Sequence, residues 1–294
     1  MRSIPSSLRM HLIVNQVFTG IVSGAVLVLL ALGLNLIFGF MEIINFSHGA
    51  FFMLGAYVGF YLLTAFGSFW WGLALVPLLL LLLGAAVERT LIKPLYRRSA
   101  VDPLLLTFGL TYIVTQLVEM IAGKQGETVN APSQLNFQLP LGFTSYPAYL
   151  TFVAVLAGLI VLGLWLLLER TSLGLIIRAG IRDSTMIQIL GIDFDRFRVL
   201  VFALGIALAG VAGVLNSPVT GVYPEMGNDI LITAFVVVVV GGMGSFWGAV
   251  LSGLVIGVLV SLTTLFASVY ASIVPFVLMI LVMTFRPRGL LGTT

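Results

Sequence analysis

Residues that could do chemistry are few in this chain, and they gather in two short strings between long apolar runs. The first string, residues 42–49, reads EIINFSHG, and the second, residues 241–245, reads GGMGS. Backbone that is not helical is tolerated at membrane depth only where it lines a polar cavity or is buried in protein. We therefore predict a broken helix beside a polar translocation path, with an ordinary loop at the membrane surface as the alternative. The residues predicted to line this path are Glu42, Asn45, Ser47, His48, Gly49, Gly241, Gly242, Gly244 and Ser245.

The motifs of common enzyme classes are missing from the sequence. There is no phosphate-binding GxxxxGK[ST] loop, no HExxH, no GxSxG and no acidic pair within an apolar run. With no cysteine and only His11 and His48, the chain offers no thiol nucleophile and too few ligands for a metal ion. A lone histidine in a helix break is expected to be a hydrogen-bonded structural residue and not a proton relay. The sequence predicts no enzyme activity, no cofactor and no metal site.

The composition is that of an all-α protein that crosses a membrane several times. Of its 294 residues 60% are hydrophobic and only 9% are charged, and the mean hydropathy is +1.17. A soluble domain usually carries about 25% charged residues. The net charge is only +3, and the basic residues gather beside apolar runs, which is the pattern of contact with lipid headgroups. The bilayer is therefore the expected partner, and nucleic-acid binding is not expected.

The apolar runs predict about eight or nine membrane segments in a single domain, residues 1–294. They are residues 12–40, 51–66, 69–91, 103–122, 148–168 and 199–215, and three segments within 230–285 divided at 241–248 and near residue 268. A membrane helix needs ~20 residues, so residues 230–285 are too long for a single crossing. Basic residues near positions 89–98 and after position 285 place those ends, and the carboxyl terminus, in the cytoplasm. Nine crossings put the amino terminus outside. Arg2 and Arg9 favour the alternative of eight crossings with one re-entrant piece.

A polar island at residues 169–198 interrupts these segments. It holds nine of the 25 charged residues, five of which are Arg, and we expect it to lie in the cytoplasm, with residues 123–147 and 216–229 as external loops. Asp183 can cap a short helix that Gly191 ends, and Asp193 can cap the next span. Met186, Ile187 and Leu190 are spaced to share one face of the short helix. The pattern alone leaves open whether this face meets a protein or rests on lipid headgroups.

Several short motifs together resemble one family of transport proteins. They are INFSHG with FMLGAY near the start, ILGID before a Gly/Ala-rich span, and GGMGSFWGA near the end. Taken together they are similar to motifs of branched-chain amino acid (LivH-type) permease subunits of ABC importers, and the resemblance covers nearly the whole chain.

The resemblance implies a subunit in a bacterial plasma (inner) membrane that pairs with a homologous permease subunit as a heterodimer. It also implies two ATPase subunits and an external binding protein that delivers a branched-chain or related amino acid. In that family the short cytoplasmic helix docks into a groove on the ATPase. The residues assigned to this coupling are Arg178, Arg182, Asp183, Met186, Ile187, Leu190 and Gly191.

Two questions stay open at the level of sequence. Ala50 stands after the HisGly pair where many relatives carry an acidic residue, which leaves urea or a short amide as alternative solutes. A passive channel or a secondary carrier is the competing class, but neither needs a docking helix, and a secondary carrier would want an ionisable group in mid-span. The similar spacing of Ser and Gly in residues 47–59 and 245–257 also predicts an internal two-fold repeat.

Overall fold

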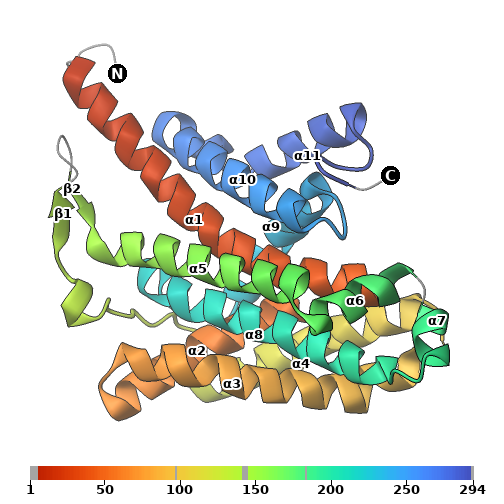
Figure 1. Ribbon diagram of the computed structural model, residues 1–294. Helices are drawn as coiled ribbons and strands as arrows, with labels where there is room; N and C mark the ends of the chain where they lie inside the picture. Colours follow the sequence, from red (N-terminus) through yellow and green to blue (C-terminus); the bar gives the residue numbers. More distant parts are fainter. Residues whose placement is uncertain (1–5, 97, 141–144, 183, 293–294) are drawn as a thin grey trace.

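The computed structural model describes residues 6–96, 98–140, 145–182 and 184–292 (Figure 1). Apolar stretches form helices here because no water is present inside a bilayer to satisfy an open backbone. Within the described residues, seven helices are long and apolar enough to cross a membrane, and α9 and α11 are shorter apolar helices. The nine are α1 (Ser6–Met41), α2 (His48–Phe66), α3 (Phe69–Val87), α4 (Val101–Ala122), α5 (Ala148–Arg170), α8 (Phe194–Thr220), α9 (Met226–Gly241), α10 (Phe246–Ala267) and α11 (Val274–Phe285). The predicted all-α, polytopic fold with about eight or nine segments is confirmed.

The centre of the bundle is formed by α1 and α8, which are buried along most of their length. Glycines let these helices approach their neighbours backbone to backbone. A Cβ atom added at Gly33 would lie 2.6 Å from the Gly205 carbonyl oxygen, and one at Gly55 would lie 2.4 Å from the Gly210 backbone. Helices in lipid associate through such small residues because close packing and not water drives their contact. The outer helices α3 and α5 cover this centre, and α4 packs on α2.

The two ends of the bundle carry different connections. The first turns of α1 lie at the same end as the hairpin of β1 (Gln138–Pro140) and β2 (Ser145–Pro147), whereas α6 (Ser172–Arg182), α7 (Ser184–Ile189) and the last described residues lie at the other end (Figure 1). The hydroxyl of Tyr146 in β2 lies 3.2 Å from the hydroxyl of Thr19 in α1, which fixes the hairpin to this end. The first and last described residues therefore lie on opposite sides, as an odd number of crossings requires.

The last apolar stretch is divided as predicted. It forms α9, α10 and α11, with a break at residues 242–245 and a second at residues 268–273, where a short 3₁₀ turn spans Ser268–Tyr270. At ~1.5 Å per residue, α9 is about 24 Å long and α11 about 18 Å, both shorter than the ~30 Å hydrocarbon core. Two segments of the fold are therefore partial crossings.

The connections on the hairpin side differ from the predicted loops. Residues 123–147 contain a 3₁₀ turn at Ser133–Leu135 and the antiparallel hairpin, in which Leu139 pairs with Tyr146. Residues 216–229 are mostly helical, because α8 continues to Thr220 and α9 begins at Met226. The expected long loop is wrong, and only residues 221–225 connect the two helices. Pro218 stands in the last turn of α8, and Gly221, with a φ of 76°, ends that helix.

On the other side, the end of α3 leads into a π-helical turn. This turn covers Glu88–Ile92 and is followed by a 3₁₀ turn at Lys93–Leu95. The polar island holds two short helices, α6 and α7, where the sequence predicted one. Gly174 permits the sharp bend between α5 and α6, because a Cβ atom there would lie 1.9 Å from the Leu168 carbonyl oxygen.

Candidate functional site

The first predicted string is a re-entrant break between α1 and α2. Glu42 follows the end of α1 in a left-handed conformation, with a φ of 56°, and turns the chain back into the bundle. The Nε2 atom of His48 lies 3.0 Å from the carbonyl oxygen of Leu30, which stands eleven residues before Met41. At ~1.5 Å per residue, α2 therefore begins about 16 Å inside the end of α1. The geometry is the predicted broken helix and not a surface loop.

The polar side chains of this break are enclosed. Asn45, Ser47 and His48 each expose 0% of their surface, whereas Glu42 is exposed at the outer edge of the bundle. The Oδ1 atom of Asn45 accepts hydrogen bonds from the Ser47 hydroxyl at 2.6 Å and from the Ser47 N–H at 3.1 Å. Gly49 packs on the backbone of Gly227 at the start of α9. The prediction that these side chains line an open path is wrong for this conformation, because the helices close over them.

The second predicted string is held against α1 by one amide side chain. The Nδ2 atom of Asn35 donates to the Ser245 carbonyl at 3.0 Å, and its Oδ1 atom accepts from the Gly244 N–H at 2.7 Å. Ser245 caps α10 by accepting from the Gly248 N–H at 3.1 Å. Gly242 and Gly244 both have positive φ, which no side chain would favour. No signal in the sequence predicted this role of Asn35 in fixing the break.

The two strings lie on different faces of α1. The first packs at Leu30 and Gly33, while the second packs at Asn35 and Gly39. Successive helical residues are ~100° apart, so positions 33 and 35 point in nearly opposite directions. A hollow of about 340 Å³ beside Asn35, Gly244 and Ser245 is also lined by Glu169 and Arg178. The expectation that both strings line one path is not what the structure shows, because α1 separates them.

A groove lined by both apolar and polar side chains lies between α4 and α9. Its volume is about 380 Å³, and six polar side chains contribute to its wall. They are Thr111, Thr115, Gln116, Glu119, Glu225 and Asn228. The four residues from α4 recur at helical spacing along the groove, with Thr111 buried and the other three at least partly exposed. Charged and strongly polar side chains such as Glu119 and Gln116 are costly where they face lipid, which makes this face of α4 a candidate contact for water, a solute or another protein.

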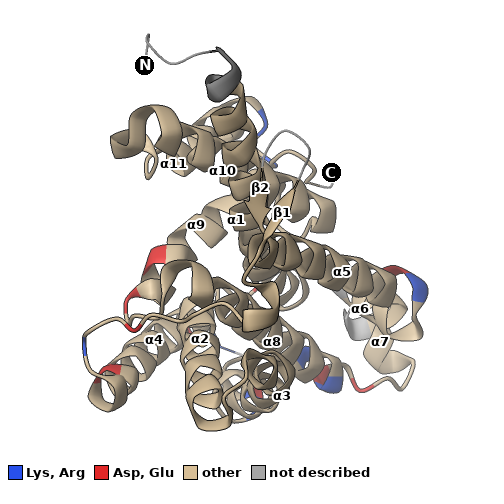
Figure 2. Cartoon of the chain, turned by 90° about the vertical axis from the view of Figure 1, so that its left-hand side faces the viewer, with Lys and Arg blue, Asp and Glu red and all other residues tan. Residues whose placement is uncertain are grey.

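Acidic residues mark the outer end of this groove. Glu119 stands in the last turn of α4, and Glu225 immediately precedes α9. Figure 2 shows acidic positions at these helix ends on the hairpin side of the molecule. The Oε2 atom of Glu225 accepts from the Asn228 amide at 2.8 Å, and Glu119 pairs with Lys124 at 3.9 Å. The signal for this groove in the sequence is the row of Thr111, Thr115, Gln116 and Glu119 in an apolar helix. It was not among the predicted site residues.

A second hollow lies on the other side of α9. It measures about 590 Å³ and is bordered by α1, α9, α10 and α11. Asn228 and Ile232 of α9 line both this hollow and the groove beside α4. Gln16 and Ser261 tie α1 to α10 at its edge through two bonds of 2.8 and 2.7 Å. The outer half of α9 is thus flanked by polar hollows on both sides. This short helix is the centre of the polar face.

The residues predicted to couple to an ATPase divide into buried and exposed groups. Ile187 exposes only 7% of its surface and packs with Phe40, Ile177 and Phe194. The large apolar side chains that face outward are Met186 (52% exposed), Ile189 (73%) and Leu190 (67%). The prediction that Ile187 shares a docking face with Met186 and Leu190 is wrong, because Ile187 anchors α7 to its own chain.

The arginines and caps of this loop also differ from expectation. Arg178 pairs with Glu169 at 3.0 Å and bonds to the Leu168 carbonyl, and it therefore holds α6 on the end of α5. Gly191 has a φ of 79° and ends α7 as predicted. Asp193 stands at the N-cap of α8, but its carboxylate pairs with Arg196 at 2.8 Å. Asp183 and the side chain of Arg182 lie outside the described residues.

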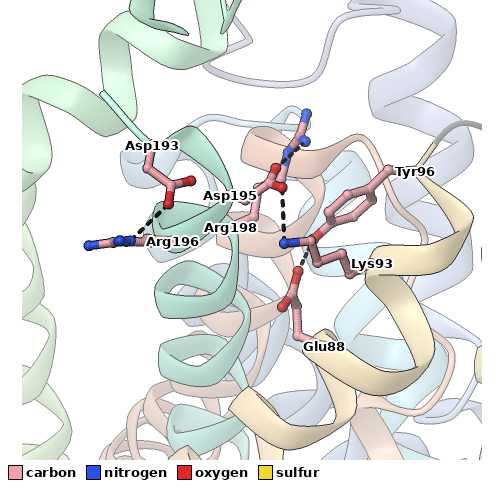
Figure 3. A network of polar contacts seen from close by, with 7 residues as sticks. All are labelled: Glu88, Lys93, Tyr96, Asp193, Asp195, Arg196 and Arg198. Atoms are coloured by element: carbon pink, nitrogen blue, oxygen red, sulfur yellow. Dashed lines mark hydrogen bonds and ion pairs between the residues drawn. The ribbon is translucent and has the colours of Figure 1, made fainter. Parts of the chain in front are cut away.

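A polar network ties the start of α8 to the turns after α3 (Figure 3). Asp195 pairs with Lys93 at 3.1 Å and with Arg198 at 3.1 Å. The Arg198 guanidinium lies 4.5 Å from the centre of the Tyr96 ring, and the Tyr96 hydroxyl donates to the buried Glu88. Burial raises the pKa of the Tyr96 phenol far above its ordinary value, and the hydrogen bond to Glu88 raises that pKa further. The sequence did not predict this junction.

The nine helices, with a groove between α4 and α9 and apolar residues exposed on the short helix α7, define a multi-pass membrane protein. Residues 16–283 match the family described as the permease component of branched-chain amino acid transport systems, and the chain belongs to this family. The predicted LivH-type resemblance is thereby confirmed.

Curated relatives agree with this assignment. The chain is 33% identical to the high-affinity branched-chain amino acid transport system permease protein BraD of Pseudomonas aeruginosa, over 94% of this chain and 95% of that protein. It is 32% identical to the probable branched-chain amino acid transport permease protein LivH of Methanocaldococcus jannaschii, over 92% of this chain and 90% of that protein. It is also 28% identical to the permease LivM of Escherichia coli, over 91% of this chain and 68% of that protein.

Proposed function

We propose that this chain is one permease subunit of an ATP-driven importer and that it carries branched-chain amino acids along the groove between α4 and α9. The observation that carries the proposal is the row of polar side chains Thr115, Gln116 and Glu119 on the groove side of α4, which the buried Thr111 continues into the bundle. Polar side chains at that place are explained by a solute path that a second subunit completes. The apolar wall of the groove, including Leu231 and Ile232, suits a branched aliphatic side chain.

The partners follow from the faces that the chain leaves uncovered. A homologous permease subunit would pack against the α4 and α9 face, and the likeness of this chain to both LivH and LivM supports a heterodimer. ATPase subunits would dock on the exposed side of α7 and supply the energy, since the sequence has no phosphate-binding loop. An external binding protein would deliver solute at the hairpin side. In this arrangement the carboxyl terminus would lie on the cytoplasmic side of a bacterial plasma membrane.

A groove-filling substitution tests the path. Thr115→Trp adds a large ring inside the groove, whereas the matched control Ile113→Trp adds the same ring to an exposed position of α4, ~200° round the helix from Thr115. In membrane vesicles that contain the whole importer, we expect Thr115→Trp to abolish uptake of labelled leucine and Ile113→Trp to preserve it. Both variants must co-purify with the other subunits. Normal leucine uptake by assembled Thr115→Trp would refute the assignment of the path.

A further inference from the structure

The inner end of the α4 and α9 groove is closed by three aromatic rings from three different elements. Phe46 comes from the break between α1 and α2, Phe108 from α4 and Phe235 from α9. The Phe46 ring centre lies 6.0 Å from that of Phe108, edge to face, and 5.3 Å from that of Phe235. Glu119 and Glu225 stand at the opposite ends of the same two helices. The three rings therefore narrow the groove at the end opposite its acidic residues.

Phe46 separates this groove from the buried polar side chains of the break. Its ring lines the groove, while the flanking Asn45 and Ser47 have no exposed surface. Behind it, the Nδ2 atom of Asn45 and the Nδ1 atom of His48 have no hydrogen-bond partner among the described residues. His48 uses its other nitrogen on the Leu30 carbonyl, so Nδ1 is left as an acceptor. Buried polar atoms without partners are uncommon in native proteins and call for an explanation such as function.

The backbone at Phe46 is attached to α4. Its N–H donates to the Thr107 hydroxyl at 3.2 Å, and the same hydroxyl lies 3.4 Å from the Ile44 carbonyl oxygen. Thr107 directly precedes Phe108 in α4 and is fully buried. The break is also packed on α9, where Gly49 lies against the Gly227 backbone, so it is tied to both walls of the groove. A change in the spacing of α4 and α9 would therefore part the Phe46 ring from Phe108 or from Phe235.

We propose that Phe46 is the gate at the inner end of the groove, closed here against Phe108 and Phe235, and that opening it admits water and solute to Asn45 and His48. Because the groove is the solute path only under the function proposed above, the gate rests on that proposal. The two unpartnered atoms gain hydration or solute contacts in the open state. The polar string singled out in the sequence then contributes to the path only when the gate opens.

Thiol labelling tests this gate without any measurement of transport. The natural chain has no cysteine, so Ser47→Cys places a single thiol behind the Phe46 ring. The assembled importer in membranes is treated from the hairpin side with a small, charged methanethiosulfonate reagent. We expect Ser47→Cys to be nearly unreactive when Phe46 is present. Adding Phe46→Ala should raise the labelling rate by about tenfold or more, because the rate follows the fraction of time that the site is open.

Two further variants keep the test decisive. Phe66→Ala removes an exposed aromatic ring far from the groove and should leave Ser47→Cys protected. Phe235→Ala removes a ring from α9 and should increase labelling even if Phe46→Ala does not assemble. Labelling of Ser47→Cys that is fast with Phe46 intact, or unchanged in assembled Phe46→Ala or Phe235→Ala, would overturn the gate. That result would leave the path standing if Thr115→Trp still blocks leucine uptake.

Discussion

Substitution of Leu190 separates docking of an ATPase on α7 from contact with lipid headgroups. Leu190 exposes 67% of its surface, and it lies beside exposed Ile189 on the last turn before Gly191. Burying a whole leucine side chain contributes about 1.5–3 kcal/mol, so covering its exposed two-thirds would contribute about 1–2 kcal/mol. Leu190→Ala should therefore weaken ATPase association by about 5- to 30-fold at ~1.4 kcal/mol per decade. Leu190→Asp should abolish it, since a carboxylate would be buried without a partner.

Ile187 provides the matched control on the same helix. It is buried against Phe40, Ile177 and Phe194 within the chain itself. Ile187→Ala should lower the free energy of unfolding by about 2–5 kcal/mol, as large-to-small changes in a core do. Leu190→Ala should change that free energy by less than about 0.5 kcal/mol, as expected for an exposed site. The two neighbouring positions are thus predicted to fail in different ways.

The assay is a titration of the purified permease pair with the ATPase subunits, followed by a thermal melt of each variant. The docking account predicts weaker binding with an unchanged melt for Leu190→Ala, and a lowered melt for Ile187→Ala. If α7 rests on lipid headgroups instead, Leu190→Asp would detach it from the membrane and leave the ATPase affinity as it was. Native affinity for Leu190→Asp would refute the docking of α7.

Two other predictions concern stability, and both are read from melts of the purified chain. Gly55→Ala forces a Cβ atom against the α8 backbone and should destabilise the fold by about 1–3 kcal/mol. Its control, Gly158→Ala, adds a Cβ atom where no described atom lies within 4 Å and should stabilise the fold slightly. Equal melting temperatures for the two variants would contradict the close packing of α2 on α8. Tyr96→Phe leaves the buried Glu88 carboxyl without its donor and should lower the free energy of unfolding by about 1–3 kcal/mol. Lys93→Ala breaks a half-exposed ion pair and should lower it by at most about 1 kcal/mol. A larger loss for Lys93→Ala than for Tyr96→Phe would contradict this account of the junction.

Membrane segments were predictable because hydropathy has one dominant cause. An apolar run must be a helix in lipid, so α2 to α5 and the three-part division after residue 230 could be placed within a few residues of their observed ends. Gly191 could be assigned as the end of α7 because a positive φ is where glycine has its advantage. In these cases the local residue types decide the structure, whatever the rest of the chain does.

The facing of side chains was less predictable, because tertiary contacts decide it. Ile187 and Leu190 have the same character and nearly the same place on α7, yet only the packing of Phe40 and Phe194 buries one of them. The two glycine-rich strings look alike in sequence, but α1 passes between them. The internal two-fold repeat stays a prediction, supported by the fact that Ser47 in the first string and Ser245 in the second each stand immediately before a helix.

The α4 and α9 groove could have been found from the polar stripe on α4, but its closure could not. Thr115, Gln116 and Glu119 stand out in an apolar helix once a periodicity of 3.6 is applied. Phe46 lies within residues 42–49, where only the polar residues and Gly49 were predicted to have a role. Its contacts with Phe108 and Phe235 join residues far apart in the chain. Contacts of that kind are set by the fold and leave no local signal.

The most direct test of the proposed function is leucine uptake into proteoliposomes of defined composition. One set of vesicles contains this chain with its partner permease, both ATPase subunits, internal ATP and the external binding protein, and the other contains this chain alone. The account predicts ATP-dependent accumulation of leucine in the first set and none in the second, with no competition by excess urea. Accumulation by the chain alone, or uptake that urea and not isoleucine suppresses, would contradict it.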